Sequence, residues 1–556
     1  MNKILSCAAA ALLAACAQGQ AVKGTLTATG ESTVLNPLCY GIYFDDINRA
    51  ADGGLYSELL QNGDFEYTAG ESGEPGWGPE YGWDTAGDKI AISVQTEAPL
   101  SENNPTYARV ELRNVIATVL NTGGSAIVNK GYDGIAVRKE RNYIFSMKAR
   151  APKNMNLEVA LFSPENKKVA TGKLTVKASK EWKDFDLVLT PTEDCADASL
   201  RIMPRSTGSF DIDMASLFPE KTFRGHAGGM RDDLAQQLAD MHPGFVMFPG
   251  ASLMKNGYDW KGTVGAPENR RPLPNPNGGH QSRRLGYLEF LQFCEDAGTE
   301  AVPMAAADVQ DALDLIQFAN GDISTEWGAR RAEAGHAGKF NIKYIGVADA
   351  AAYAKVADAV KTAHPEITVV RADAPAYVGR TLCNVTALDQ AHQLIALANS
   401  GKAMAHPSTP LLADKKHAQI APALISFDKN GVYPSSDAEA MRLFGIGTGD
   451  RLLRTRLSLD THNAENGIGA VATQDSNTGD VLLCMVNDMG SEATLDVDMR
   501  PYFPEGQGSI TALRNTLSGE PSATEPKVVT DRVAVPSAFF TIPLAPHSLT
   551  IMRLKK

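Results

Sequence analysis

The chain has 556 residues, of which 43% are hydrophobic and 21% are charged, a composition typical of globular domains with substantial cores. This length predicts three or four domains. The formal net charge of −12 argues against nucleic acid or an anionic membrane surface as a partner and is compatible with a neutral glycan.

Residues 1–21 have the features of an export signal. Lys3 precedes an apolar run at 4–15 that is too short to span a bilayer. The Leu-Ala-Ala-Cys sequence at 13–16 resembles a bacterial lipobox and predicts lipidation of Cys16. The alternative is plain secretion with cleavage near Ala21. We expect an exported lipoprotein of the bacterial cell envelope, periplasmic or on the cell surface.

The mature chain begins with an expected edge strand at 22–37, where small and β-prone residues alternate. Residues 38–66 are predicted to form a strand and then a helix, because the leucines from Leu55 onward have helical spacing. Short alternating runs separated by turns follow, and they predict a β-sandwich at 67–223.

Strands and helices alternate from 224 to 451, which predicts a parallel sheet. The expected strands lie at 244–248, 300–304, 342–347 and 367–370, and the expected helices lie at 230–241, 287–297, 312–318, 351–363 and 387–399. Residues 452–556 are strand-like again and predict a C-terminal β-sandwich, which the strand at 22–37 is expected to join.

Several landmarks resemble glycoside hydrolase family 51, the α-L-arabinofuranosidases. Residues 38–66 are similar to the opening of that family's barrel, and further landmarks lie at 260–272, 286–298, 312–320 and 327–346. The resemblance implies a multidomain α/β plus all-β protein. Its expected parts are a shortened TIM-type (β/α) barrel at 38–66 and 224–451, an inserted sandwich like a carbohydrate-binding module at 67–223, and the C-terminal β-sandwich.

The catalytic positions implied by the resemblance are altered. The family is a retaining one, and such glycosidases need two carboxyl groups roughly 5–5.5 Å apart. The acid/base Glu follows an Asn at the end of a barrel strand, and the corresponding residues here are Asp349 and Ala350. A methyl group cannot transfer a proton. The strand end that carries the family's nucleophile has no counterpart between Asp349 and Arg451, so the sequence predicts an internally shortened barrel.

The implied sugar-binding positions are also changed. The family's Phe-Glu-Asp-Ile reads Phe-Asp-Asp-Ile with Asp45 and Asp46, and Met247 replaces an Arg. The third strand ends in Ala-Ala-Asp with Asp308 where an Asn is expected. Each Asp also has a structural interpretation. Asp46 is expected to brace the following turn, Asp308 to cap a helix, and Asp349 to be too short and misplaced for catalysis, while Asp45 is open.

Aromatic residues and cysteines complete the candidates. Trp77 and Trp83 lie in a Gly/Pro-rich loop and could stack on sugar rings, whereas Trp182 is expected in a core. Five widely spaced cysteines follow Cys16 without any metal-type cluster. We expect mostly buried free thiols, although an exported compartment permits disulfides. No cofactor or metal is expected.

Three functions remain open. The leading hypothesis is a diverged homologue with weak or no hydrolysis that binds arabinose-containing glycan or another neutral polysaccharide. The second is an active exo-acting α-L-arabinofuranosidase that uses relocated carboxylates. The third is a structural envelope lipoprotein without a ligand. The altered positions, and not the fold, distinguish these hypotheses.

Overall fold

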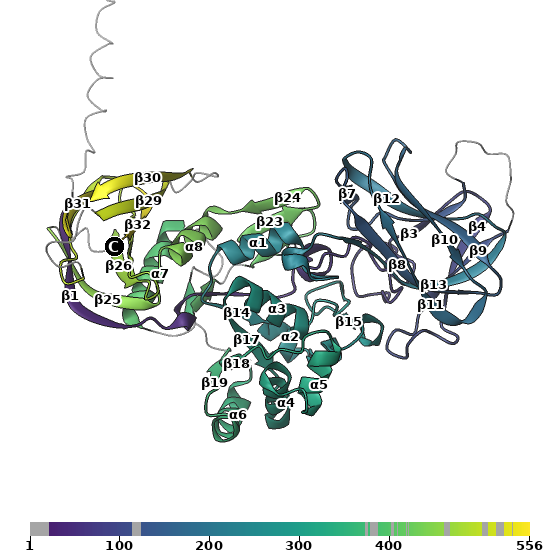
Figure 1. Cartoon of the computed structure of the whole chain (residues 1–556), viewed down its shortest axis with the longest axis horizontal. Helices are drawn as coiled ribbons and strands as arrows, with labels where there is room; N and C mark the ends of the chain where they lie inside the picture. The colour runs from purple at the N-terminus through teal and green to yellow at the C-terminus, as the bar shows by residue number, and fades with distance from the viewer. Residues whose placement is uncertain are drawn as a thin grey trace, which may run out of the picture.

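The computed structural model describes residues 22–113, 124–372, 376–378, 387–401, 405–407, 410–418, 420, 422–460, 467–502, 510–518, 527–535 and 537–555. Two β-rich bodies lie on either side of a central α/β body (Figure 1). The predicted export signal with Cys16 lies outside the described residues. Within the described part, no helix is both long and apolar enough to cross a membrane.

The central body is built on a parallel sheet in the order β19-β18-β17-β14-β2. Its strands are β2 (Gly41–Tyr43), β14 (Phe245–Phe248), β17 (Glu300–Ala305), β18 (Tyr344–Val347) and β19 (Thr368–Arg371). The helices are α1 (Asp232–Asp240), α2 (Ala251–Lys255), α3 (Tyr287–Ala297), α4 (Val309–Asn320), α5 (Glu326–Glu333) and α6 (Ala350–Ala363). A complete barrel has eight such strands, and the hydrogen-bonded sheet of the described residues has five.

Shorter pieces follow the five-stranded sheet. β20 (Ala376–Val378) and β21 (Ala405–Pro407) form a parallel pair around α7 (Ala387–Ser400), and β21 lies beside β2. β22 (Leu412–Asp414) and β23 (Ile425–Asp428) are parallel, and β24 (Gly431–Pro434) and α8 (Ser436–Ile446) complete this region. A β15–β16 hairpin (Leu273–Pro274 and His280–Gln281) projects from the loop after α2.

The helix predicted after the first strand is wrong. Residues Ala51–Leu55 form one π-type turn with Gly53 at a φ of +81°, and the chain then extends towards the sandwich. Leu55 packs in the core of the central body, whereas Leu60 packs in the core of the sandwich. The leucines therefore serve two different cores, which the spacing alone cannot distinguish from one helical face.

The inserted sandwich has two antiparallel sheets. One contains β3 (Trp83–Ala86), β6 (Ala126–Asn129), β7 (Ile135–Val137), β9 (Met155–Phe162), β10 (Lys168–Val176) and β12 (Cys195–Pro204). The other contains β4 (Ile90–Gln95), β5 (Tyr107–Leu112), β8 (Tyr143–Ala151), β11 (Ser179–Leu189) and β13 (Gly208–Pro219). Alternate residues of both sheets point inward and share one apolar core.

The C-terminal body is one nine-stranded sheet in the order β30-β29-β32-β27-β26-β25-β1-β28-β31. β1 (Val22–Val34) is antiparallel to β25 (Arg451–Leu459) and parallel to β28 (Ala493–Asp498). The other strands are β26 (Ile468–Gln474), β27 (Val481–Asn487), β29 (Ile510–Ser518), β30 (Lys527–Val535), β31 (Phe539–Leu544) and β32 (Ser548–Leu554). The sheet curls (Figure 1), so side chains from β1, β27, β31 and β32 meet in one core.

Candidate functional site

The carboxyl ends of β2, β14, β17 and β18 lie along one edge of the parallel sheet, where α/β barrels carry their active sites. We refer to this edge as the head of the sheet. The positions selected from the sequence follow these strands or lie near their ends: Asp45, Asp46, Met247, Asp308, Asp349 and Ala350.

Asp46 is buried at the head of the sheet, and both of its carboxylate oxygens accept hydrogen bonds. Its Oδ1 accepts a hydrogen bond of 3.0 Å from the Ala51 amide, so it braces the turn as the sequence analysis expected. Its Oδ2 accepts bonds from the side chains of Asn275 at 3.1 Å and Gln281 at 2.9 Å. Burial and the neighbouring Asp52 charge raise the pKa of Asp46 to about 7.

The β15–β16 hairpin supplies these amides and covers the head of the sheet. Asn275 also donates to the backbone oxygen of Asp46 at 2.8 Å, and Asp52 accepts a bond of 2.7 Å from the Ser282 amide next to the hairpin. The remaining hollow beside Asp46 measures only about 10 Å³. Such a volume holds about one water molecule, so a sugar ring does not fit in this conformation.

Asp45 lies against the glycine that follows β14. A Cβ atom on Gly250 would lie 2.1 Å from the Asp45 carboxyl carbon, so a larger residue at 250 would displace this side chain. One Asp45 carboxylate oxygen is buried without a hydrogen-bond partner among the described residues. Burial raises the pKa of Asp45 to about 6.

Met247 lies inside the central body. Its side chain is fully buried in a small apolar cluster that includes Phe245, Val302 and Met304. The cluster fills the inner face of the sheet, and Gly346 leaves space there for the Met304 sulfur, which would lie 2.3 Å from a Cβ at that position. Methionine suits such a gap because its thioether is flexible and apolar.

Asp308 and Asp349 both act as helix N-caps. Asp308 accepts from the Asp311 amide at 3.0 Å at the start of α4. Asp349 accepts from the amides of Ala351 at 2.7 Å and Ala352 at 2.9 Å at the start of α6. Ala350 is the exposed first residue of α6. The carboxylate beside the predicted acid/base position is therefore used to satisfy backbone donors.

The tryptophans differ in accessibility. Trp83 is 6% exposed, stacks on Phe65 at 5.3 Å and donates to the Asn62 backbone oxygen, so it is a core residue. Trp77 is partly buried and stacks on Tyr67 at 4.3 Å, with its indole N–H bound to Glu71. Trp182, expected in a core, is only half-buried on β11, 4.5 Å beneath the Arg150 guanidinium.

The described cysteines are free thiols. Cys39, Cys294 and Cys484 are buried and Cys195 is half-buried, in agreement with the expectation of buried free thiols for most of them. Cys383 lies outside the described residues. Across the described ranges, no group of three or more His, Cys, Asp or Glu side chains is placed to hold a metal ion.

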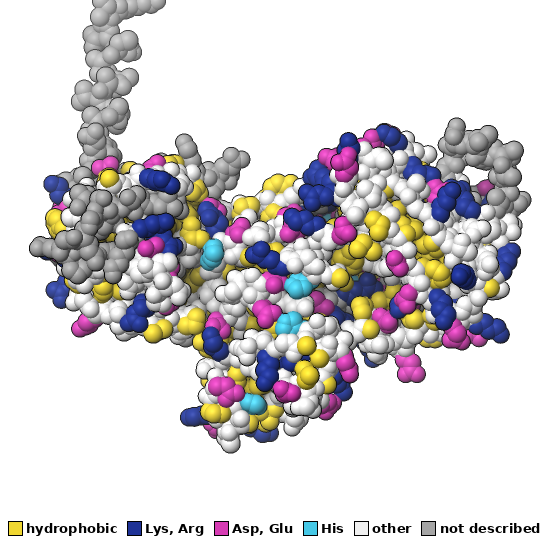
Figure 2. All heavy atoms as spheres, viewed as in Figure 1, with side chains coloured by type: hydrophobic (Ala, Val, Ile, Leu, Met, Phe, Trp, Pro, Cys, Tyr) yellow, Lys and Arg dark blue, Asp and Glu magenta, His cyan; other side chains and the backbone are white. Residues whose placement is uncertain are grey.

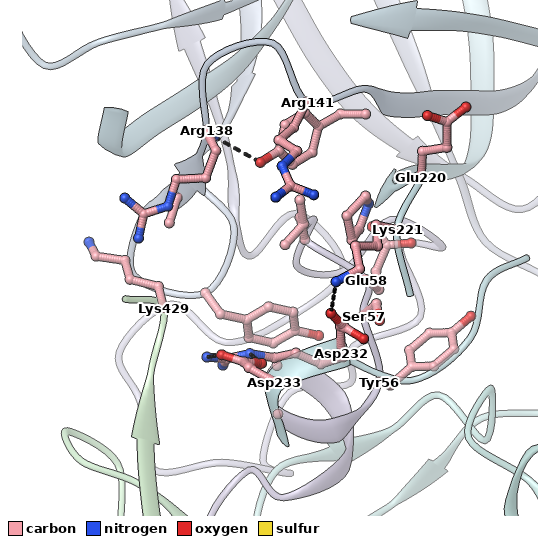
Figure 3. A pocket seen from close by; sticks show the side chains of 18 of the residues that line it. Tyr56, Ser57, Glu58, Arg138, Arg141, Glu220, Lys221, Asp232, Asp233 and Lys429 are labelled. Atoms are coloured by element: carbon pink, nitrogen blue, oxygen red, sulfur yellow. Dashed lines mark hydrogen bonds and ion pairs between the residues drawn. The ribbon is translucent and has the colours of Figure 1, made fainter. Parts of the chain in front are cut away.

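A cleft of about 540 Å³ lies where the sandwich meets the central body, and we call it the junction cleft. Its walls come from the turn after β2, the sandwich residues around β7 and β8, the start of α1, and residues near β22 and β23. Figure 3 shows Arg138 and Arg141 on one side, opposite Tyr56, Asp232 and Asp233. No sequence pattern predicted this cleft, because its residues are distant in the chain and form no local motif.

Comparison with known proteins gives consistent matches. A family model described as the α-L-arabinofuranosidase 1 domain matches residues 237–399. An extracellular exo-α-L-arabinofuranosidase of Streptomyces chartreusis is 28% identical over 82% of this chain and 65% of its own length. α-L-Arabinofuranosidase 1 of Arabidopsis thaliana is 30% identical over 60% of this chain and 53% of its own length. The chain thus spans between about half and two thirds of the length of these relatives.

The fold agrees with these matches. The structure of an arabinose-bound family 51 α-L-arabinofuranosidase superimposes with a TM-score of 0.81 and 22% sequence identity, covering 96% of this chain and 100% of that one. A likeness at this identity concerns the fold, and the sequence matches supply the family. The chain is therefore an α-L-arabinofuranosidase-like protein related to glycoside hydrolase family 51.

Proposed function

We propose that this protein binds arabinose-containing glycan without hydrolysing it by the family's retaining mechanism. The observation that carries the proposal is Ala350, the first residue of α6 just after β18, where a methyl group occupies the position that the resemblance assigns to the acid/base. Its neighbour Asp349 is engaged by two helix amides. General acid catalysis requires a proton donor within hydrogen-bond reach of the glycosidic oxygen.

The filled head of the sheet supports the same proposal. The side-chain amides of the β15–β16 hairpin already donate hydrogen bonds to Asp46, and the remaining space holds about one water molecule. Glycan binding is proposed from the relatives, which are α-L-arabinofuranosidases, and from the open junction cleft. The lipobox-like sequence ending at Cys16 supports a location at the bacterial envelope.

Asp45 supports the alternative of an active enzyme with relocated carboxylates. Its raised pKa of about 6 resembles that of carboxyl groups that act as general acids. However, a retaining mechanism needs a second carboxyl group roughly 5–5.5 Å away. The neighbouring Asp46 is held by three hydrogen bonds and is not free to attack a sugar.

The first test is turnover of an aryl α-L-arabinofuranoside by the full-length protein, with isothermal titration against arabinan and arabinoxylan fragments in parallel. We expect no turnover above the uncatalysed rate and saturable binding of a fragment. Turnover that Asp45→Asn abolishes would contradict the proposal and establish the alternative. A folded protein that neither binds nor hydrolyses any fragment would also contradict it.

A further inference from the structure

The junction cleft has the size and the lining of a carbohydrate site. Its volume of about 540 Å³ lies within the range of roughly 300–1,000 Å³ typical of small-ligand sites. Tyr132 is a half-buried aromatic residue of the wall, Tyr56 and Tyr143 are mostly buried rings beside the cleft, and Ser57 and Asn142 are polar residues of its lining. Aromatic faces with a few polar groups suit a sugar, which has both apolar C–H faces and hydroxyl groups.

Most basic side chains of the cleft already have acidic partners. Lys221 pairs with Asp232 at 2.6 Å across the cleft wall. Arg231 pairs with Asp233 at 2.7 Å, and Lys429 pairs with Asp197. These cations are therefore compensated within the protein and are less available for an anionic ligand.

Arg138 and Arg141 differ from the other cations. Both are exposed on the turn between β7 and β8. The nearest acid to Arg138 is Asp194 at 3.7 Å, and both side chains are more than 60% exposed, so this contact is weak. Arg141 has no acidic partner within ion-pair distance among the described residues. Figure 2 shows Lys and Arg side chains gathered at this junction, between the places that β24 and β7 occupy in Figure 1.

We propose that the junction cleft binds a glycan through the carboxylate of a uronic acid residue, held by Arg138 and Arg141. The guanidinium group matches a carboxylate with two parallel hydrogen bonds, which neutral sugars cannot accept as strongly. The inference rests on the proposed function, since it names the site and the chemical class of the bound glycan.

The charge of the whole chain limits the ligand further. Salt screens both the net charge of −12 and the two arginines beyond about 8 Å, so a single carboxylate gains from contact with the arginines while the remaining charges of a polyanion meet a net negative protein surface. The cleft should therefore favour a mostly neutral glycan with sparse uronic acid residues over a fully acidic polymer.

The test compares arabinose-containing oligosaccharides of equal length, with and without one uronic acid unit, by isothermal titration with the full-length protein. We expect the uronic acid form to bind about fivefold to tenfold tighter, as contacts with two exposed guanidinium groups imply. The double variant Arg138→Gln/Arg141→Gln should lose this preference and keep its affinity for the neutral form. Both side chains are exposed, so the variant should fold.

The matched control is Lys180→Gln/Lys183→Gln, which removes the same charge from exposed positions on β11 outside the cleft. It should keep the preference. Equal binding of both oligosaccharides by the wild type, or equal loss in both double variants, would overturn the cleft assignment while leaving glycan binding intact. A wild type that binds neither oligosaccharide would contradict the proposed function itself, and the cleft assignment with it. A preference for a fully acidic polymer over the sparsely charged oligosaccharide would overturn the stated ligand class.

Discussion

Replacing Arg284 by Met should lower the free energy of unfolding by about 3–5 kcal/mol, because it leaves buried carboxylates without a counter-charge. Arg284 is 7% exposed, and its guanidinium lies 3.3 Å from Asp64 and 3.7 Å from Glu58. Glu58 also accepts bonds from the Leu217 amide and the Ser216 hydroxyl of the sandwich. The cluster therefore joins the sandwich to the central body.

Urea unfolding at pH 7 measures this effect, and Arg271→Met is the control. Arg271 is exposed in the same stretch of chain, so its replacement should change stability by less than about 0.5 kcal/mol. Burial raises the pKa of Glu58, so the loss caused by Arg284→Met should shrink in acid, where the carboxyl group takes up a proton. Equal stability of the two variants at pH 7 would show that the cluster is hydrated.

Local sequence patterns correctly predicted elements whose apolar residues all face one hydrophobic core. The helix expected at 287–297 is observed as Tyr287–Ala297, because its apolar positions face one core and Gly298 ends it in a left-handed conformation. The helix predicted around residues 55–60 is wrong, because the leucines there pack into two different cores. The predicted C-terminal sandwich is built from one curled sheet. A sequence pattern can identify the strands, but it does not determine which strands are hydrogen-bonded to each other.

The sequence predicted where the candidate site lies, but not that a hairpin covers it. Strand ends at the head of the sheet follow from parallel topology, so Asp46 and Asp349 could be placed there from the sequence. That Asn275 and Gln281 would fold over Asp46 depends on a hairpin more than 200 residues away. The junction cleft likewise requires four separate parts of the chain to meet, and none of them carries a signal for it on its own.

Replacing Asp46 by Asn should remove a pH dependence from the free energy of unfolding. Asp46 has a usual pKa of 3.8 that the fold raises to about 7. Between these values the folded state holds a proton that the unfolded state releases, so the Asp46 contribution to stability is lost as pH rises. A shift of roughly three units corresponds to about 4 kcal/mol. The stability of Asp46→Asn relative to wild type should rise by about this amount from pH 4 to pH 8, measured by urea unfolding.

Glu158→Gln provides a control, because the fold lowers the pKa of Glu158 whereas it raises the pKa of Asp46. Burial alone would raise the pKa of Glu158, but hydrogen bonds from Lys168 and Arg205 outweigh it and lower the pKa to about 2. Its contribution is present above its usual pKa of 4.5 and is lost as pH falls towards 2, so this variant should show a constant difference from wild type between pH 5 and pH 8. A flat response of Asp46→Asn over the same interval would mean that water reaches Asp46. The head of the sheet would then be open to a ligand, which contradicts the packing of the hairpin and weakens the case against hydrolysis.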